Sequence, residues 1–190
     1  MAQLGEMHSA SFGTDPKHLG FVLARYKFVA KMLAGKNRVL EVGCGDTTGA
    51  RVVRPAVGQL IGVDVKQCED PCIPIIVHDF LDEPLDDQFD AAYALDVLEH
   101  IQPTREIIFL SNLVASVNPG APVIIGTPSK ESQAYASEMS RRYHVNCKTE
   151  DQLRKTLGEH FANVFLFGMN DETLHTGFGP MCQYRLAVCT

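Results

Sequence analysis

The sequence lacks the features that mark membrane-spanning or secreted proteins. None of its apolar runs approaches the roughly 20 residues that a membrane-spanning helix needs. The first residues, MAQLGEMHSASFGTD, contain neither the basic segment nor the apolar stretch of a secretory signal. The six cysteines lack the regular spacing of a disulfide scaffold, and Cys68 and Cys72 have the wrong gap for a CxxC motif. We therefore expect a cytoplasmic protein with free thiols and no membrane partner.

Positive charge is also scarce. The chain has 17 Lys and Arg against 23 Asp and Glu, a formal net charge of −6. Proteins that bind long nucleic acids usually carry a basic face, because contacts with phosphates supply much of their affinity. The densest basic clusters here are short, namely Arg25 with Lys27 and Arg141 with Arg142. Extended nucleic acid is therefore disfavoured as a partner.

The pattern of apolar residues indicates alternating strands and helices. A helix is expected over residues 14–35, with Asp15 as its N-cap and Pro16 at its first position. A second helix begins at Pro103, and Thr149 with Gln152 forms the capping-box pattern of a third. The strand-like runs are Arg38–Val42, Leu60–Val63, Ile73–Val77, Phe89–Leu95, Pro122–Ile125, Asn163–Phe167 and Gln183–Val188.

Short buried strands separated by helices predict an α/β fold, a doubly wound Rossmann-like sheet of seven mostly parallel strands. The last two runs are joined by a loop too short for a crossover helix, so the final strand should be antiparallel. The length of 190 residues fits one domain spanning 1–190. Within it we expect a loose arm over residues 1–13 and a lid over residues 129–148.

The most informative segment is the glycine loop of residues 39–49, where an apolar strand runs into Gly43 and Gly45 and a helix follows. Asp64 and Asp79 end the next two strands, and Glu41 lies inside the first. A single acid at a strand end is common, but acids at successive strand ends predict nucleoside binding at the carboxyl edge of the sheet. A dinucleotide-dependent dehydrogenase is disfavoured, because its GxGxxG spacing is GxGxxxG here and Glu41 would approach the phosphates.

These residues resemble the class I S-adenosylmethionine-dependent methyltransferases. The likeness rests on ExGxG, on the acids after the second and third strands, on FDAAYALDVLEH and on NPGAPVIIGTPS, and it covers roughly residues 36–128. Thr47 departs from the pattern, since many relatives have a third glycine there. The resemblance implies a site for S-adenosylmethionine in which Gly43–Gly45 face the methionine moiety, Asp64 the ribose, Asp79 with Phe80 the adenine, and the Leu95 carbonyl the amino group. The implied set also includes Glu41, Cys44 and Val65.

Catalytic candidates should lie on loops at the same edge. His100 follows the fourth strand, His175 follows the sixth, and His144 lies in the expected lid. Asp96, Glu99 and His100 resemble the ExxEH segment that holds a divalent ion in ubiquinone-biosynthesis O-methyltransferases and small-RNA 3′-end 2′-O-methyltransferases. Asp96 replaces the first Glu of that motif, so we favour a metal-free carboxylate–histidine pair over a metal site, with His144 or His175 as a further ligand in the metal version.

Three functions remain open on the sequence. The first is methyl transfer to a small-molecule or saccharide acceptor, at oxygen. The second is 2′-O-methylation of an RNA ribose, which should require a basic groove. The third is a non-catalytic regulatory module that binds S-adenosylmethionine. The sequence does not indicate the acceptor or the oligomeric state.

Overall fold

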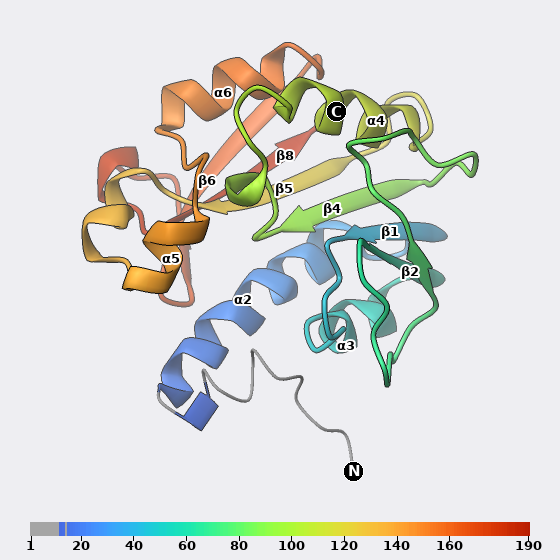
Figure 1. Ribbon diagram of the computed structural model, residues 1–190, viewed down its shortest axis with the longest axis horizontal. Helices are drawn as coiled ribbons and strands as arrows, with labels where there is room; N and C mark the ends of the chain where they lie inside the picture. The colour runs from blue at the N-terminus through green and yellow to red at the C-terminus, as the bar shows by residue number, and fades with distance from the viewer. Residues whose placement is uncertain (1–11, 14) are drawn as a thin grey trace.

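The computed structural model describes residues 12–13 and 15–190, so the expected arm over residues 1–13 lies almost wholly outside the described residues. One eight-stranded sheet runs through the molecule between two layers of helices (Figure 1). The strands are β1 (Arg38–Val42), β2 (Gln59–Asp64), β3 (Ile75–Val77), β4 (Ala91–Leu95), β5 (Val123–Pro128), β6 (Val164–Asn170), β7 (Thr173–His175) and β8 (Tyr184–Cys189).

The strand order is β3-β2-β1-β4-β5-β8-β6-β7. The first five strands in this order are parallel, and β8 is antiparallel to both β5 and β6. The predicted Rossmann-like sheet with an antiparallel last strand is therefore confirmed. The sheet has one strand more than the seven predicted. The additional strand is β7, which forms because residues 173–175 fold back on residues 168–170. The order of connection reverses between β1 and β4, and ligands of such sheets bind at the carboxyl ends of the strands at that point.

The helices divide between the two faces of the sheet (Figure 1). Apolar residues of α4 and α6 join one core cluster, and those of α2 and α3 join the other. The helices are α2 (Pro16–Met32), α3 (Ala50–Val53), α4 (Glu106–Ala115), α5 (Glu138–Tyr143) and α6 (Glu150–Gly158). No helix in residues 12–13 and 15–190 is long and apolar enough to cross a membrane.

The two predicted helix caps have different outcomes. Thr149 and Gln152 form the expected capping box at the start of α6. Asp15 does precede Pro16 at the start of α2, but the prediction of a side-chain cap is wrong. The reason is that the backbone carbonyl of Asp15 already accepts a hydrogen bond from the amide of His18, at 3.1 Å, which satisfies that donor.

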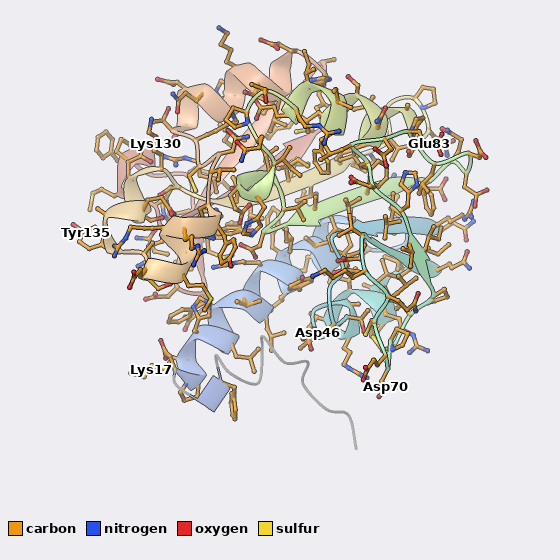
Figure 2. All side chains as sticks on the ribbon, viewed as in Figure 1. Lys17, Asp46, Asp70, Glu83, Lys130 and Tyr135 are labelled. Atoms are coloured by element: carbon orange, nitrogen blue, oxygen red, sulfur yellow. The ribbon has the colours of Figure 1, made fainter. Side chains whose placement is uncertain are left out.

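The segment predicted as a lid forms two short helical turns outside the sheet. These are the 3₁₀ turn η3 (Glu131–Tyr135) and α5. A parallel bridge between Ser129 and Lys148 closes the base of the segment. Its tip is open to solvent, and Tyr135, which is 93% exposed, projects from the molecule (Figure 2).

Candidate active site at the carboxyl edge of the sheet

The glycine loop between β1 and α3 turns through three residues in the left-handed region. Their φ angles are 74° at Gly43, 50° at Gly45 and 59° at Thr47. A Cβ on Gly43 would collide with the side chain of Val97, whereas one on Gly45 would meet no atom within 4 Å. Gly43 thus lets the loop approach the segment after β4 closely, and Gly45 leaves open space beside the backbone. Thr47 adopts the conformation expected of the missing third glycine.

Asp64, at the end of β2, faces this loop. Its Oδ2 accepts the amide of Gly45 at 2.9 Å and its Oδ1 accepts the amide of Lys66 at 3.1 Å. A carboxylate has about four acceptor positions, so Asp64 retains acceptors for the hydroxyls of a ribose. The next residue, Val65, is 59% exposed and offers an apolar surface beside that carboxylate.

The predicted adenine-facing pair at the end of β3 is only partly accessible. Asp79 is partly exposed, and its Oδ1 accepts the amide of Leu81 at 2.8 Å. The ring of Phe80 is buried, with edge-to-face contacts to His78 and Phe109 at centroid distances of 5.1 and 6.2 Å. The Phe80 side chain therefore belongs to the core, and a contact with an adenine is left to its backbone.

Glu41 is buried inside β1, with one carboxyl oxygen, Oε2, that has no hydrogen-bond partner within residues 12–13 and 15–190. Burial raises the pKa of Glu41 to about 8, although Tyr93 and Tyr26 act to lower it. The adjacent thiol of Cys44 is buried as well, and burial raises its pKa to about 12, so it stays protonated. Glu41 is thus a neutral acid at pH 7 with spare capacity to face a cation or a donor. Leu95 is buried at the carboxyl end of the neighbouring strand β4.

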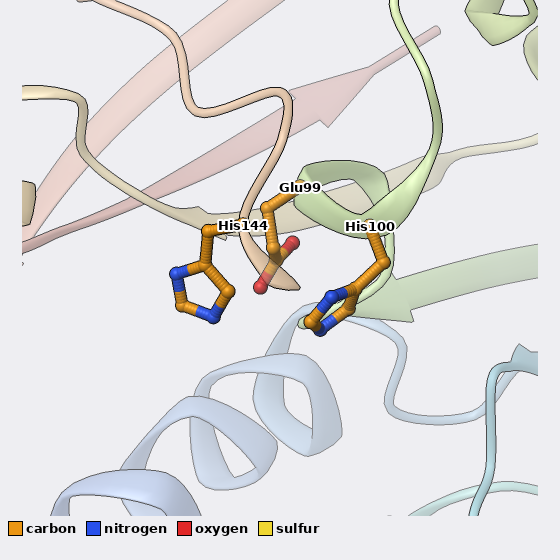
Figure 3. Close-up of side chains that lie close together, drawn as sticks. All are labelled: Glu99, His100 and His144. Atoms are coloured by element: carbon orange, nitrogen blue, oxygen red, sulfur yellow. The ribbon is translucent and has the colours of Figure 1, made fainter. Parts of the chain in front are cut away.

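Glu99, His100 and His144 lie close together at the segment that follows β4 (Figure 3). Glu99 and His100 lie on the 3₁₀ turn η2 (Leu98–His100), and His144 follows α5. The amides of Val145 and Asn146 donate to the Glu99 carbonyl at 2.8 and 3.0 Å, which fixes the end of the lid segment over η2. One ligand atom from each of the three side chains lies within 4.8 Å of the others.

One nitrogen of each histidine ring in this cluster has a hydrogen-bond partner, and one oxygen of Glu99 has none among the described residues. Nδ1 of His100 lies 3.1 Å from the carbonyl of Tyr143, and Nδ1 of His144 lies 3.1 Å from the amide oxygen of Gln133. Both partners are acceptors, so each Nδ1 carries the proton and each Nε2 has a free lone pair. Thr127 donates to Oε2 of Glu99 at 3.2 Å, while the buried Oε1 has no partner among the described residues.

Burial and the charge of Asp96 raise the pKa of Glu99 well above its usual value. Burial, together with the neighbouring His100, lowers the pKa of His144, which favours the neutral imidazole. A bound cation would favour the ionised form of this buried carboxyl and would bind the neutral imidazole.

Asp96, the first residue of the DVLEH segment, pairs elsewhere. Both of its carboxylate oxygens lie 2.9 Å from Nη1 of Arg25 on α2. The Arg25 guanidinium lies over the ring of Tyr184, 3.8 Å from its centroid. Core packing explains the apolar face of α2, and the sequence alone did not pair Arg25 with Asp96. The feature of the sequence that could have singled out Arg25 is a positively charged residue between Val22 and Val29 on the apolar face of that helix.

The structure does not bring His175 to this cluster. His175 ends β7, and the strands β5, β8 and β6 separate β7 from β4 in the sheet. Both ring nitrogens have local partners, because Nε2 lies 3.2 Å from Oδ1 of Asn170 and Nδ1 accepts the amide of Gly177 at 3.1 Å. His144 is therefore the histidine that joins His100.

A hollow of about 520 Å³ lies away from all of these residues. It is lined by residues 35–37, Asp90 and residues 118–121, which belong to turns at the amino ends of β1, β4 and β5. Chemistry in this fold is found at the opposite, carboxyl edge. We therefore take the hollow as an open groove between turns and not as the site.

Comparisons with known proteins identify the family of the chain. The family described as the methyltransferase domain matches residues 18–161, whereas no curated protein matches the sequence. Similar solved structures include the methyltransferase domain of bacterial CtHen1-C, at 20% identity over 90% of this chain and 98% of that one, with a TM-score of 0.70. The small RNA methyltransferase HEN1 is 16% identical over 86% of this chain but only 24% of its own length, with a TM-score of 0.68.

A further similar structure is the N-methyltransferase NodS from Bradyrhizobium japonicum, 17% identical over 92% of this chain and 96% of that one, with a TM-score of 0.60. These neighbours share the fold, and their acceptors differ. The family match covers most of the chain, including the glycine loop and the segment after β4. The chain therefore belongs to the methyltransferase-domain family, the class I S-adenosylmethionine-dependent methyltransferases.

Proposed function

We propose that this enzyme transfers the methyl group of S-adenosylmethionine to a hydroxyl oxygen of a small-molecule or saccharide acceptor, assisted by a divalent cation. The observation that carries the proposal is the convergence of Glu99, His100 and His144 at the segment that follows β4. Direct contact between the loop and the segment after β4, at Gly43 and Val97, supports a shared site.

The residues at the carboxyl edge fit the cofactor. Open space beside Gly45, spare acceptors on Asp64 and the exposed side chain of Val65 suit a nucleoside. The unpartnered Oε2 of Glu41 suits a positively charged group. When bound, S-adenosylmethionine would supply an electrophilic methyl on its sulfonium, and the protein would hold the acceptor oxygen in line with it.

The cluster fits a cation better than a carboxylate–histidine pair. A pair of that kind needs a carboxylate that accepts the Nδ1 proton of His100, but this proton goes to the Tyr143 carbonyl. Asp96 is held by Arg25, and Glu99 by Thr127. Histidines that bind metals commonly donate their second nitrogen to a carbonyl, as both do here. Donor atoms on one ion are at most about 4.2 Å apart, so small side-chain rotations would complete the site.

Glu99, His100 and His144 would hold the cation, which would lower the pKa of an acceptor hydroxyl and orient it. Three protein ligands leave positions for oxygen atoms of the acceptor. Thr127 keeps the Glu99 carboxylate in place, and Gln133 does the same for the His144 ring. We further propose that the lid segment, residues 129–148, covers the acceptor, because it supplies His144.

The test is formation of S-adenosylhomocysteine from S-adenosylmethionine with a panel of saccharides, phenols and amines. The enzyme is assayed before and after treatment with EDTA and desalting, and again after addition of Mg²⁺, Mn²⁺ or Zn²⁺. We expect activity with hydroxyl acceptors that EDTA removes and one of the ions restores. His144→Ala should lose most activity, whereas His160→Ala, a histidine after α6, should keep it. Full activity in metal-free buffer would exclude the cation.

A terminal RNA ribose is the second candidate acceptor, and the lid segment supports it. Arg141, Arg142 and Tyr143 are exposed on α5 beside His144, and Tyr135 is exposed nearby. Arginines and aromatic rings of this kind contact phosphates and stack on bases. Short RNAs with a free 3′-terminal ribose should then be methylated in preference to saccharides, and turnover should fall steeply with salt. Binding of S-adenosylhomocysteine without turnover on any acceptor would favour the regulatory module.

A further inference from the structure

The ion pair of Arg25 and Asp96 joins α2 to the segment that follows β4. Asp96 follows β4 directly and precedes Glu99 by one turn of chain. Asp96 thus belongs to the same short segment as Glu99 and His100, but its carboxylate pairs with Arg25 on α2.

The pairing of Arg25 is incomplete. Both oxygens of Asp96 bond to Nη1, at 2.9 Å each. The buried Nε of Arg25 has no partner within the described part of the chain. A carboxylate binds arginine best through two parallel hydrogen bonds from two nitrogens, so Arg25 still has a strong donor edge to offer to a second anion. The ring of Tyr184 holds the guanidinium plane in position for it.

We propose that Arg25 and Asp96 couple the two binding events: a carboxylate of the bound cofactor pairs with Arg25, and Asp96 is released to become a further ligand of the cation at Glu99, His100 and His144. This inference rests on the proposed function, since it assumes that cofactor and that cation site. Asp96 and Arg25 act here as positioning residues.

Charge balance gives the physical reason for the coupling. One guanidinium neutralises one carboxylate, and Arg25 is only 14% exposed in its side chain. A second carboxylate competes with Asp96 for this guanidinium, and an Asp96 carboxylate that loses its partner so close in the chain to the buried Glu99 is unfavourable unless a cation offsets its charge. The cofactor should therefore favour the cation, and by linkage the cation should favour the cofactor by the same factor.

The experiment measures Mn²⁺ affinity by calorimetry, and free Mn²⁺ by electron paramagnetic resonance, with the full chain. Each measurement is made without ligand, with S-adenosylhomocysteine, and with 5′-methylthioadenosine, which has the adenosine and thioether but no carboxylate. We expect S-adenosylhomocysteine to tighten Mn²⁺ binding about 10-fold or more, and 5′-methylthioadenosine to leave it unchanged.

Variants separate the two residues. Asp96→Asn should bind Mn²⁺ as the unliganded wild type does and should not respond to S-adenosylhomocysteine. Arg25→Ala should bind Mn²⁺ tightly without any ligand, because Asp96 is then free. Circular dichroism checks folding, and the isosteric Asp96→Asn keeps the test valid if Arg25→Ala does not fold. Tyr184→Phe, which keeps the ring under Arg25, is the matched control.

Three results would overturn the coupling. Mn²⁺ binding by the wild type that S-adenosylhomocysteine does not change would remove the coupling and keep the cation site. A response that persists in Asp96→Asn would show that another group carries it. Absence of Mn²⁺ binding in every state would remove the cation from the proposed function as well.

Discussion

Glu41 lies directly opposite Tyr93 on the neighbouring parallel strands β1 and β4, and both side chains are buried. The hydroxyl of Tyr93 and the Oε2 of Glu41 have no strong hydrogen-bond partner among the described residues. The raised pKa of Glu41, about 8 against an ordinary 4.5, reflects this enclosed position. The pair makes both the stability of the fold and the binding of a cation at β1 depend on pH.

The first prediction concerns stability. Because folding raises the pKa of Glu41, its contribution is fully present below pH 4.5 and declines as the pH rises to about 8. Glu41→Gln removes this titration, so the variant should have a higher Tm than the wild type at pH 9, by about 3 °C or more. Thermal melts from pH 5 to 9 measure the difference. The exposed Glu69→Gln is the control, and parallel profiles for all three proteins would show that Glu41 does not titrate in this range.

The second prediction concerns proton release. At pH 7 the free protein carries a protonated Glu41, and the positive charge of S-adenosylmethionine should lower the pKa of that carboxyl. Binding should therefore release a proton. Calorimetry in buffers of different ionisation enthalpy should show an observed enthalpy that varies with the buffer, and the variation should vanish in Glu41→Gln. An enthalpy independent of buffer in the wild type would place the charge away from Glu41.

The third prediction uses the contact between Gly43 and Val97. Gly43→Ala places a Cβ at a φ of 74° and against the Val97 side chain, so it should lower the free energy of unfolding by about 2–4 kcal/mol. Gly45→Ala has a φ of 50° but no neighbour, and it should lose about 1 kcal/mol. The double variant Gly43→Ala/Val97→Ala should recover part of the lost free energy of unfolding, which urea denaturation measures. No recovery would assign the whole effect to the backbone.

The fourth prediction tests Asp64. Asp64→Ala removes the acceptors proposed for the ribose and also releases the amide of Gly45. We expect the affinity for S-adenosylhomocysteine to fall about 10-fold to 100-fold. The affinity of Asp64→Asn should lie between those of the wild type and Asp64→Ala. Calorimetry measures it, and Asp70→Ala, an exposed acid in the following loop, should bind normally. Unchanged affinity in Asp64→Ala would remove this residue from the nucleoside site.

The fifth prediction separates His175 from His144. His175→Ala breaks two hydrogen bonds that hold the loop after β7, so it should lower stability by about 1 kcal/mol and leave Mn²⁺ binding intact. His144→Ala should leave stability nearly unchanged and lose Mn²⁺ binding. The comparison needs denaturation curves, metal titrations and turnover for both variants. A loss of turnover in a well-folded His175→Ala would return this residue to the catalytic group.

The sequence predicted the sheet well because its strands are short buried apolar runs with glycines or acids at their ends, as at Val42 and Asp64. It predicted the glycine loop for the same local reason. The partner of Asp96 could not be read in this way, because Arg25 reaches it from a helix far along the chain. His144 was one of two open choices, and only the hydrogen bonds to the Glu99 carbonyl place it over His100. The sequence could not show that the Phe80 ring turns into the core, because proximity to a site does not tell which way a ring points.

The position of β8 has a consequence for how the chain acquires its structure during translation. β8 is buried throughout and lies between β5 and β6, so residues 184–189 follow the other seven strands in chain order yet occupy the interior of the sheet. Until these residues have left the ribosome, β5 presents an unpaired edge, and an exposed strand edge pairs readily with other chains. The sheet can therefore close only after β8 has emerged, and β5 stays exposed to aggregation until then.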